Sequence, residues 1–527
     1  MTDVTSTSGA VEDNDKITKD ILLVAGVVVL GSIMSILDIT VVNVALPTFQ
    51  ADFGVDAYST VAWTVTGYTL ALAAIIPVTG WAADRYGTKR LYLVAIGLFT
   101  LGSVLCATAW NIESLIAFRV LQGLGGGMLM PLGMTIMTRA AGPHRMGRLM
   151  AILGVPMLLG PIMGPILGGW LIEIASWHWV FLINLPLGII AIIYGLKVLP
   201  SDAPEPSESF DFIGMLLMSP GLALFLYGVS SIPETGTVAA SKVLVPGIVG
   251  LLLIVAFVFY SFRPKHPLLD LRLFKNRNLT VATIVMFLFA GAFFGALLLV
   301  PTYYQQVRGA SVLEAGLLVA PQGLGAMLTM PIAGALADKL PVGRIVPFGF
   351  LGILLGMFGL AQSSGPETPY WQLIVWLFVL GLGMGATMMP IFTSALKTLK
   401  EHDVARGSTL INVIQQVASS AGVAVMSVVL TNHLKASDAA SAYAAIGEST
   451  LKGVAAPEWA MKVADALGAA FESTALADMA SSFSSTYWVA FAIIAFTLIP
   501  VAMLPRKREE SHLLDDEDGP KAPVMMH

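Results

Sequence analysis

The chain has 527 residues, of which 56% are hydrophobic and 12% are charged, and its formal net charge is −5. Soluble domains carry about 25% charged residues, so the composition excludes an ordinary soluble protein. The apolar residues recur in runs of about twenty, the length at which a helix crosses roughly 30 Å of hydrocarbon, whereas a membrane β-barrel alternates over about ten residues. The sequence therefore predicts an all-α polytopic membrane protein.

The apolar runs predict about fourteen transmembrane helices. Residues 1–20 are polar and acidic, and we expect a disordered cytoplasmic tail there without a cleavable signal. The first six spans are expected near 21–46, 59–81, 91–109, 114–138, 149–172 and 179–199. Two more are expected near 212–230 and 243–262, and the last six near 280–301, 314–336, 345–362, 371–396, 407–431 and 485–504.

Lysine and arginine gather in every second connection, beginning with Arg85, Lys89 and Arg90 and then Arg139, Arg145 and Arg148. The positive-inside rule places these connections in the cytoplasm, and an even number of spans then places both termini there. We expect a multi-pass protein of the cytoplasmic (inner) membrane with a second cytoplasmic tail at 505–527. The segment 435–484, rich in alanine and serine, is expected to be helical and extracytoplasmic.

Two motifs occur twice, in the same order. GWAADRYGTKR (Gly80–Arg90) returns as GALADKLPVGR (Gly334–Arg344), and RVLQGLGGGMLMP (Arg119–Pro131) returns as FVLGLGMGATMMP (Phe378–Pro390). These echoes indicate two duplicated six-helix halves, 21–199 and 280–504, separated at 200–279 by an inserted helix pair and its linkers. Two related bundles around a central site are typical of secondary transporters.

The motifs resemble those of the major facilitator superfamily, specifically the fourteen-helix drug:proton antiporter branch of EmrB/QacA type. LDITVVNVALP resembles the first-helix signature of this branch, GWAADRYGTKR its loop motif, RVLQGLGGG its fourth-helix motif and GPIMGPILGGW its fifth-helix antiporter motif. The resemblance implies two pseudo-symmetric six-helix bundles plus two inserted helices. It also implies proton-coupled export of lipophilic, often cationic, compounds by alternating access.

Asp38 lies deep in the first predicted span. A charge at such depth costs between about 2.5 and well over 10 kcal/mol, so it persists where it faces a partner or a cavity. A structural carboxylate is one interpretation; the favoured one is a group that takes up and releases the coupling proton. Arg119, at comparable depth in the fourth span, is the expected partner, and the resemblance associates it with proton coupling. The repeat has Phe378 at that position, so packing alone does not require the charge.

The connection Gly80–Arg90 and its repeat are expected to form a cytoplasmic gate. Tight turns explain the glycines and the positive-inside bias explains the cations, but neither explains Asp84. We expect Asp84 to accept hydrogen bonds from a helix N-terminus in the other half. The repeat keeps Asp338 but has Pro341 in the turn, which predicts a weaker latch. The gating residues are Gly80, Asp84, Arg85, Gly87, Lys89, Arg90, Asp338 and Arg344.

Glycines and prolines crowd the fifth predicted span. Small residues four apart let helices pack closely, and the resemblance implies that this interface prevents uncoupled leak. This antiporter motif comprises Gly154, Pro156, Gly160, Gly164, Pro165, Gly168 and Gly169. Polar, aromatic and methionine side chains of other spans are candidates for a roomy substrate pocket. They are Asn43, Gln122, Met128, Tyr303, Gln322, Asn412 and Gln415.

Other function classes find little support in the sequence. GLGGG lies in an apolar helix without a following GK[ST], and no metal-ligand spacing occurs, so we expect no enzymatic activity, no cofactor and no metal. The expected partners are the lipid bilayer, protons and a small lipophilic substrate, with no nucleic acid; the chain is expected to be a monomer, and an extracytoplasmic adaptor could contact 435–484. Two alternatives stay open: a dedicated exporter of an endogenous amphiphile or lipid, and a non-transporting membrane sensor or scaffold. Buried charge argues against the scaffold.

Overall fold

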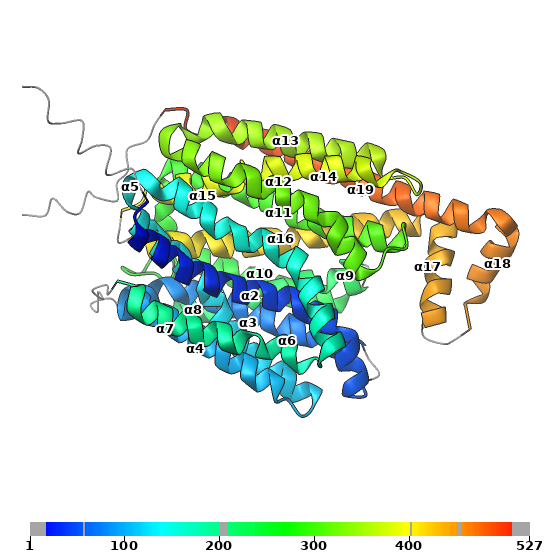
Figure 1. Ribbon diagram of the computed structural model, residues 1–527, viewed down its shortest axis with the longest axis horizontal. Coiled ribbons are helices and arrows are strands. Elements are labelled where there is room, and N and C mark those ends of the chain that lie inside the picture. The colour runs from blue at the N-terminus through cyan, green and yellow to red at the C-terminus, as the bar shows by residue number, and fades with distance from the viewer. Residues whose placement is uncertain are drawn as a thin grey trace, which may run out of the picture.

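The computed structural model describes residues 17–55, 58–200, 209–235, 237–400, 403–451 and 455–507. Every regular element in these ranges is a helix, which confirms the all-α prediction. The long helices lie roughly side by side along the long axis of the molecule (Figure 1). α2 begins and α19 ends at the same end of the bundle, on the left of Figure 1.

The helices fall into two halves with an inserted pair between them. The first half contains α2 (Lys19–Asp52), α3 (Tyr58–Tyr86), α4 (Thr88–Ala107), α5 (Ile112–Ile174), α6 (His178–Leu182) and α7 (Asn184–Val198). The inserted part contains α8 (Phe212–Ser230), α9 (Ile232–Thr235), α10 (Ser241–Tyr260) and the 3-10 helix η1 (Leu271–Lys275). The second half contains α11 (Arg277–Gln306), α12 (Val312–Lys339), α13 (Val342–Ser363), α14 (Tyr370–Gly385), α15 (Met388–Lys397), α16 (Val404–Lys435), α17 (Asp438–Leu451), α18 (Glu458–Leu467), the 3-10 helix η3 (Gly468–Ala470) and α19 (Phe471–Ala502).

Among the described residues, 13 helical stretches are long and apolar enough to cross a membrane. The predicted fifth span, 149–172, is not among them; it lies in the second part of α5. The sequence suggests a loop near 139–148, but helical geometry continues through α5 except at Gly142, where φ is 61° and ψ is −173°. Glycine adopts this positive φ without steric cost, so one residue suffices to redirect the chain.

The C-terminal part differs from the predicted segment boundaries. α17 and α18 project beyond the right-hand end of the bundle and run across its long axis (Figure 1). α19 begins at Phe471, well before the expected start of the last span at 485. The predicted segment 435–484 therefore contains a projecting helical arm, α17–α18, and the first turns of the last long helix.

The inserted pair packs at the seam between the halves. Its apolar side chains Met218, Leu222 and Phe257 share a buried cluster with Ile76 of α3 and Leu410 of α16. α8 and α10 are themselves in backbone contact, since a Cβ on Gly228 would lie 2.7 Å from the backbone nitrogen of Gly247. This close approach through small residues is common between membrane helices.

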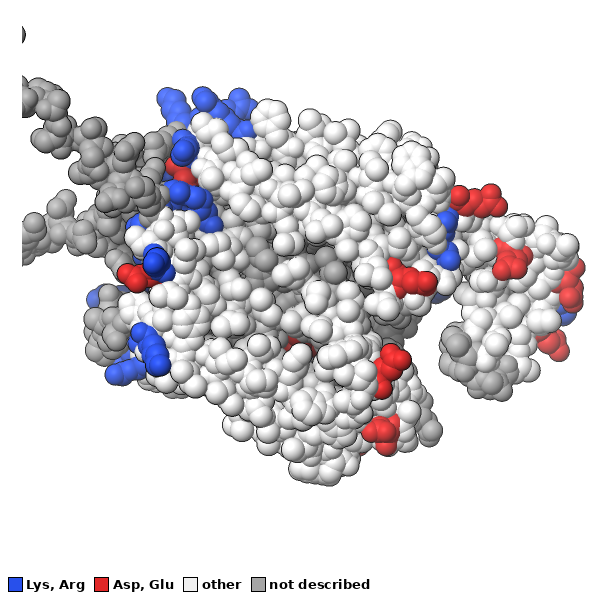
Figure 2. Space-filling view, viewed as in Figure 1, with Lys and Arg blue, Asp and Glu red and all other residues white. Residues whose placement is uncertain are grey.

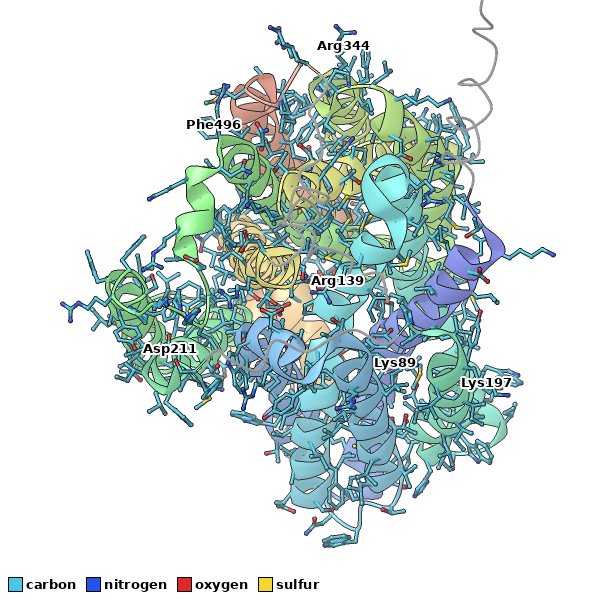
Figure 3. All side chains as sticks on the ribbon, turned by 90° about the vertical axis from the view of Figure 1, so that its left-hand side faces the viewer. Lys89, Arg139, Lys197, Asp211, Arg344 and Phe496 are labelled. Carbon is cyan, nitrogen blue, oxygen red and sulfur yellow. The ribbon has the colours of Figure 1, made fainter. Side chains whose placement is uncertain are left out.

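Charge is distributed unequally along the molecule. Figure 2 shows lysine and arginine mostly at the left-hand end, and aspartate and glutamate mostly at the opposite end and on the arm. Figure 3 looks onto the left-hand end and labels Lys89, Arg139, Lys197 and Arg344. We call this the basic end.

Candidate functional site

The two ionisable side chains expected to pair are in direct contact. Asp38 of α2 and Arg119 of α5 form an ion pair, and both side chains are 0% exposed. Gln122, one turn after Arg119, accepts a hydrogen bond from Arg119 Nη1 at 2.7 Å and donates one to Asp38 Oδ1 at 2.7 Å. Asp38, Arg119 and Gln122 thus form a closed triangle of polar contacts inside the first half.

Two more helices hold this triangle in place. Ser103 of α4 accepts a hydrogen bond from Gln122 Nε2 at 2.7 Å. Asn184, at the start of α7, donates to Ser103 Oγ at 3.0 Å and to Asp38 Oδ1 at 3.3 Å. Ser103 and Asn184 are not among the predicted site residues, although an asparagine within the apolar stretch FLINLPLG was an available signal.

The guanidinium of Arg119 also contacts α3. Its Nε donates to the carbonyl oxygen of Thr64 at 3.0 Å, and its Cζ lies 4.1 Å from the ring centroid of Tyr68, a cation–π distance. The hydroxyl of Tyr68 is 3.1 Å from Ser35 Oγ. A continuous series of contacts therefore joins the ion pair to Ser35.

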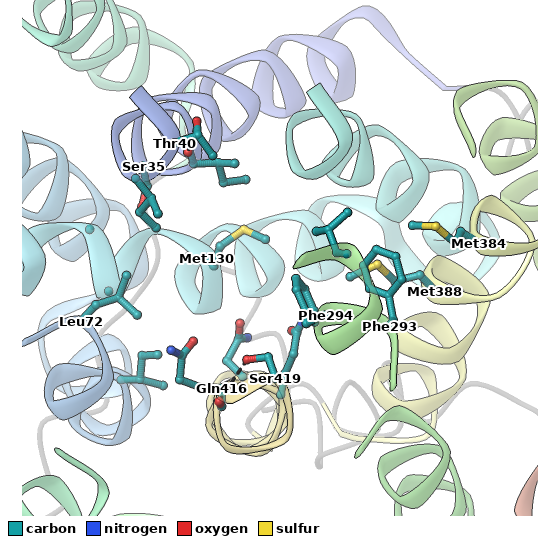
Figure 4. Close-up of a pocket in the computed structure, with 18 of the residues that line it drawn as sticks. Ser35, Thr40, Leu72, Met130, Phe293, Phe294, Met384, Met388, Gln416 and Ser419 are labelled. Carbon is teal, nitrogen blue, oxygen red and sulfur yellow. Dashed lines mark hydrogen bonds between the residues drawn. The ribbon is translucent and has the colours of Figure 1, made fainter. Parts of the chain in front are cut away.

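Ser35 is one wall residue of a cavity between the two halves, with a volume of about 310 Å³. α2, α3 and α5 supply the walls from the first half, and α11, α12, α14, α15 and α16 supply them from the second (Figure 4). Most of the lining is aliphatic, aromatic or methionine, including Met130, Met384 and Met388. The size and the mainly apolar lining are typical of a small-molecule site.

The halves also meet near the basic end. Arg406, in the first turn of α16, forms an ion pair with Asp84 of α3, with Nε 3.4 Å from Oδ2. Gly80, one turn earlier in α3, is closely packed against the same helix, since a Cβ there would lie 3.0 Å from Thr409 Oγ1. Asp84 therefore lies where α3 meets the N-terminus of a helix in the other half.

Asp338 makes the corresponding contact from the second half. Its carboxylate accepts hydrogen bonds from the backbone nitrogen of Gly147 at 2.7 Å, and from Nε and the backbone nitrogen of Arg148 at 3.0 and 3.3 Å. The sequence predicts a weaker latch here because of Pro341. Asp338 lies within α12 and Pro341 follows the end of that helix, so the proline does not take part in these three hydrogen bonds; the relative strength of the two contacts stays a prediction.

The other predicted gating residues surround these contacts. Gly87 has φ 85° and lets the chain turn between α3 and α4. Lys89 donates to two carbonyl oxygens at the end of α7, at 2.5 and 3.1 Å. Arg85 is half-buried, whereas Arg90 and Arg344 are exposed.

Residues 28–423 match the sequence pattern of the Major Facilitator Superfamily, which is most of the chain. The chain belongs to the Major Facilitator Superfamily.

Relatives within the superfamily place the chain in its EmrB-type branch. It is 48% identical over 504 residues to the multidrug resistance protein B homolog of Mycobacterium tuberculosis, covering 94% of this chain and 92% of the relative. It is 31% identical over 394 residues to the multidrug export protein EmrB of Haemophilus influenzae, covering 75% and 77%. The solved structure of the proton:xylose symporter XylE matches with a TM-score of 0.59 at 14% identity, covering 94% of this chain and 98% of that one, and supports the fold. The predicted family, branch and fold are confirmed.

In this superfamily member, the glycines of the antiporter motif pack the second part of α5 against α2. A Cβ on Gly160 would lie 2.2 Å from Ile36 Cγ2, and one on Gly164 would lie 2.1 Å from Thr40 Oγ1. A Cβ on Gly168 would also lie close to α2, 3.2 Å from the nearest heavy atom of that helix. These positions need glycine because of close helix approach, as small residues four apart predict.

The remaining motif residues have other surroundings. A Cβ on Gly154 would lie 2.2 Å from Met330 Sδ of α12, so this glycine faces the other half. Gly169 has open space on its Cβ side, with no heavy atom within 4 Å. The side chains of Pro156 and Pro165 lie outside the described residues.

The seven pocket candidates divide between the cavity and other places. Gln322, Asn412 and Gln415 line the cavity. Phe293, Phe294 and other apolar wall residues are not among the predicted pocket residues, because apolar side chains that face a cavity look like core residues in a sequence.

Four candidates do not line the cavity. Gln122 belongs to the triangle with Asp38. Asn43 is exposed and follows the last α2 residue of the lining by about one turn. Met128 is buried in the core, since it points away from the face that carries Gly127 and Met130. Tyr303 lies beyond the cavity, where its hydroxyl donates to the carbonyl oxygen of Gly365 at 2.6 Å.

Proposed function

We propose that this chain exports lipophilic compounds from the cytoplasm or the inner leaflet in exchange for protons, by alternating access. The main support is the buried pair Asp38–Arg119, which contacts the inter-half cavity through Tyr68 and Ser35. Buried ionisable residues are costly in a membrane and mark ion pathways and proton relays. The names of the M. tuberculosis and H. influenzae relatives, a multidrug resistance protein and a multidrug export protein, point to the same kind of cargo.

In the proposed cycle, Asp38 carries the proton. Arg119 keeps its charge throughout, because guanidinium is not deprotonated in proteins. Protonation of Asp38 removes the charge that holds Arg119, so the guanidinium shifts against Tyr68 and changes the wall at Ser35. Substrate release is thereby linked to proton uptake from outside, and substrate binding on the cytoplasmic side to proton loss.

The proposed orientation places the basic end in the cytoplasm, in line with the positive-inside rule. The contacts of Asp84 with Arg406 and of Asp338 with Gly147 then close the cytoplasmic side. A cycle requires both contacts to break when the cavity opens inward. The proton gradient is the proposed energy source, and the proposal includes a monomer and no cofactor.

The test uses purified full-length protein in liposomes that contain a pH-sensitive dye. A proton gradient is imposed, and chloramphenicol or another uncharged lipophilic drug is added to the wild type, to Asp38→Asn and to Asp20→Asn. Asp20 is an exposed carboxylate at the start of the same helix, so it controls for the loss of one acid.

Drug-dependent proton flux in the wild type and in Asp20→Asn, but not in Asp38→Asn, is the expected result. Full drug-dependent flux in Asp38→Asn would exclude Asp38 as the proton carrier. An absence of flux with every drug would favour the dedicated lipid exporter, which the same liposomes can test with a fluorescent lipid.

A further inference from the structure

The polar side chains on the two sides of the cavity differ in their hydrogen bonding. On the first half, Ser35 is bonded to Tyr68, and the hydroxyl of Thr40 donates to the carbonyl oxygen of Leu37 at 2.9 Å. These groups have little need for a ligand. The first half therefore presents a largely satisfied wall.

The second half presents a stripe of polar side chains on α16. Asn412, Gln415, Gln416 and Ser419 are spaced three, one and three residues apart, which places them on one face of a helix. Figure 4 shows Gln416 and Ser419 projecting from α16 on the side of the cavity opposite Ser35 and Thr40. Asn412 and Ser419 donate to backbone carbonyl oxygens of α16, whereas no described residue hydrogen-bonds to the side-chain amides of Gln415 and Gln416.

Gln322 of α12 adds an unpaired amide to the same cavity. Its side chain is only 4% exposed; Nε2 lies 3.2 Å from the sulfur of Met384, and Oε1 has no hydrogen-bond partner among the described residues. Buried polar groups are nearly always paired, and exceptions call for an explanation such as a bound molecule. The oxygen itself is not exposed to the cavity, so a rotation of the Gln322 side chain would present the amide to a ligand that supplies the missing partner.

The described walls of the cavity carry no acidic or basic side chain. Asp38 lies behind this wall, where its partner Arg119 contacts Tyr68. Its side chain is fully buried and already bonded to Arg119, Gln122 and Asn184. A permanent cation in this cavity would lose its hydration without gaining an ion pair, which is unfavourable.

We infer that the cavity selects uncharged lipophilic molecules that carry amide, carbonyl or hydroxyl groups, and that Gln322 and Gln415 hydrogen-bond to those groups. This inference rests on the proposed export function and names its substrate class. The apolar and methionine walls accept varied shapes, while the unpaired amides both donate and accept hydrogen bonds.

The experiment measures equilibrium binding of radiolabelled chloramphenicol, which is neutral and carries amide and hydroxyl groups, and of tetraphenylphosphonium, a permanent cation without hydrogen-bonding groups. The full-length wild type in lipid nanodiscs is compared with Gln322→Leu and Gln415→Leu. Each leucine variant is expected to weaken chloramphenicol binding by about five- to tenfold, the worth of one hydrogen bond, and to leave tetraphenylphosphonium binding unchanged. Gln305→Leu, at an exposed glutamine near the end of α11, is the matched control.

A variant that gains binding of one ligand distinguishes a change in selectivity from a loss of binding caused by misfolding. Gln415→Glu places an acid in the cavity and should strengthen tetraphenylphosphonium binding while it weakens chloramphenicol binding. Equal or tighter binding of tetraphenylphosphonium by the wild type, or unchanged chloramphenicol binding in both leucine variants, overturns the inference. If tetraphenylphosphonium but not chloramphenicol drives proton flux, the inferred selectivity is wrong, but proton antiport stands. If the wild type binds chloramphenicol selectively but shows no proton flux, the selectivity is supported and proton antiport is refuted.

Discussion

The close packing of α5 on α2 at Gly164 permits a quantitative prediction for Gly164→Ala. The added Cβ would lie 2.1 Å from Oγ1 and 2.4 Å from Cβ of Thr40. Rotation of the threonine side chain moves Oγ1 but leaves Cβ in place. The helices must therefore separate locally by about 1 Å to restore an ordinary carbon–carbon contact of about 3.5 Å.

This separation has an energetic and a functional consequence. Overpacking typically costs about 1–3 kcal/mol, so we expect a loss of about 2 kcal/mol in stability. Thr40 also lines the cavity, so a gap between α2 and α5 opens a route for water out of it. We expect Gly164→Ala to leak protons when no drug is present.

The assay combines thermal unfolding of the purified protein with proton leak in liposomes that contain a pH dye. Gly169→Ala is the matched control, since it adds the same methyl group to the same helix where no heavy atom lies within 4 Å. A lower melting temperature and a faster leak in Gly164→Ala alone are expected. Wild-type leak and stability in Gly164→Ala, or equal effects in both variants, would refute the reasoning.

Two further predictions concern charged contacts. Arg119→Met should lower the free energy of unfolding by about 3–5 kcal/mol, because it leaves the buried carboxylate of Asp38 without its partner. Adding Asp38→Asn to that variant should recover much of the loss. If the effects of the two single variants on unfolding simply add in the double variant, the two residues are not coupled. Asp338→Asn should weaken the contact to α5 by about 1.5 kcal/mol and increase opening at the basic end roughly tenfold. Thiol labelling of Met134→Cys from that side reports the opening. Lys197→Gln, at an exposed lysine of the basic end outside the predicted gate, is the control, and unchanged labelling in Asp338→Asn would remove Asp338 from the gate.

The sequence was informative where the membrane imposes a simple rule. Run length predicted the positions of the spanning helices, because hydrocarbon thickness fixes the number of residues needed to cross it. The cost of buried charge likewise predicted that Asp38 and Arg119 would meet, and they do. Helix ends at short connections were less predictable, since one glycine, Gly142, redirects α5 where a polar loop was expected.

The composition of the cavity was harder to predict. Helical phase and depth decide whether a polar residue faces the cavity, and sequence position alone does not give both. Met128 and Met130 are two residues apart, about 200° around the helix, so one is in the core and the other lines the cavity. Asn43 has a suitable phase on α2 but lies too far along the helix.

The described wall residues of the cavity are all uncharged, which bears on the energetics of the proposed exchange. A monovalent cation exported for one proton moves no net charge, so only the pH difference would drive that exchange. A neutral cargo leaves the charge of each entering proton uncompensated, and every cycle then carries current. A membrane potential of about 100 mV supplies about 2.3 kcal/mol for each such charge. If the chain exchanges neutral cargo for protons, as proposed, export is electrogenic and continues when the pH on the two sides of the membrane is equal.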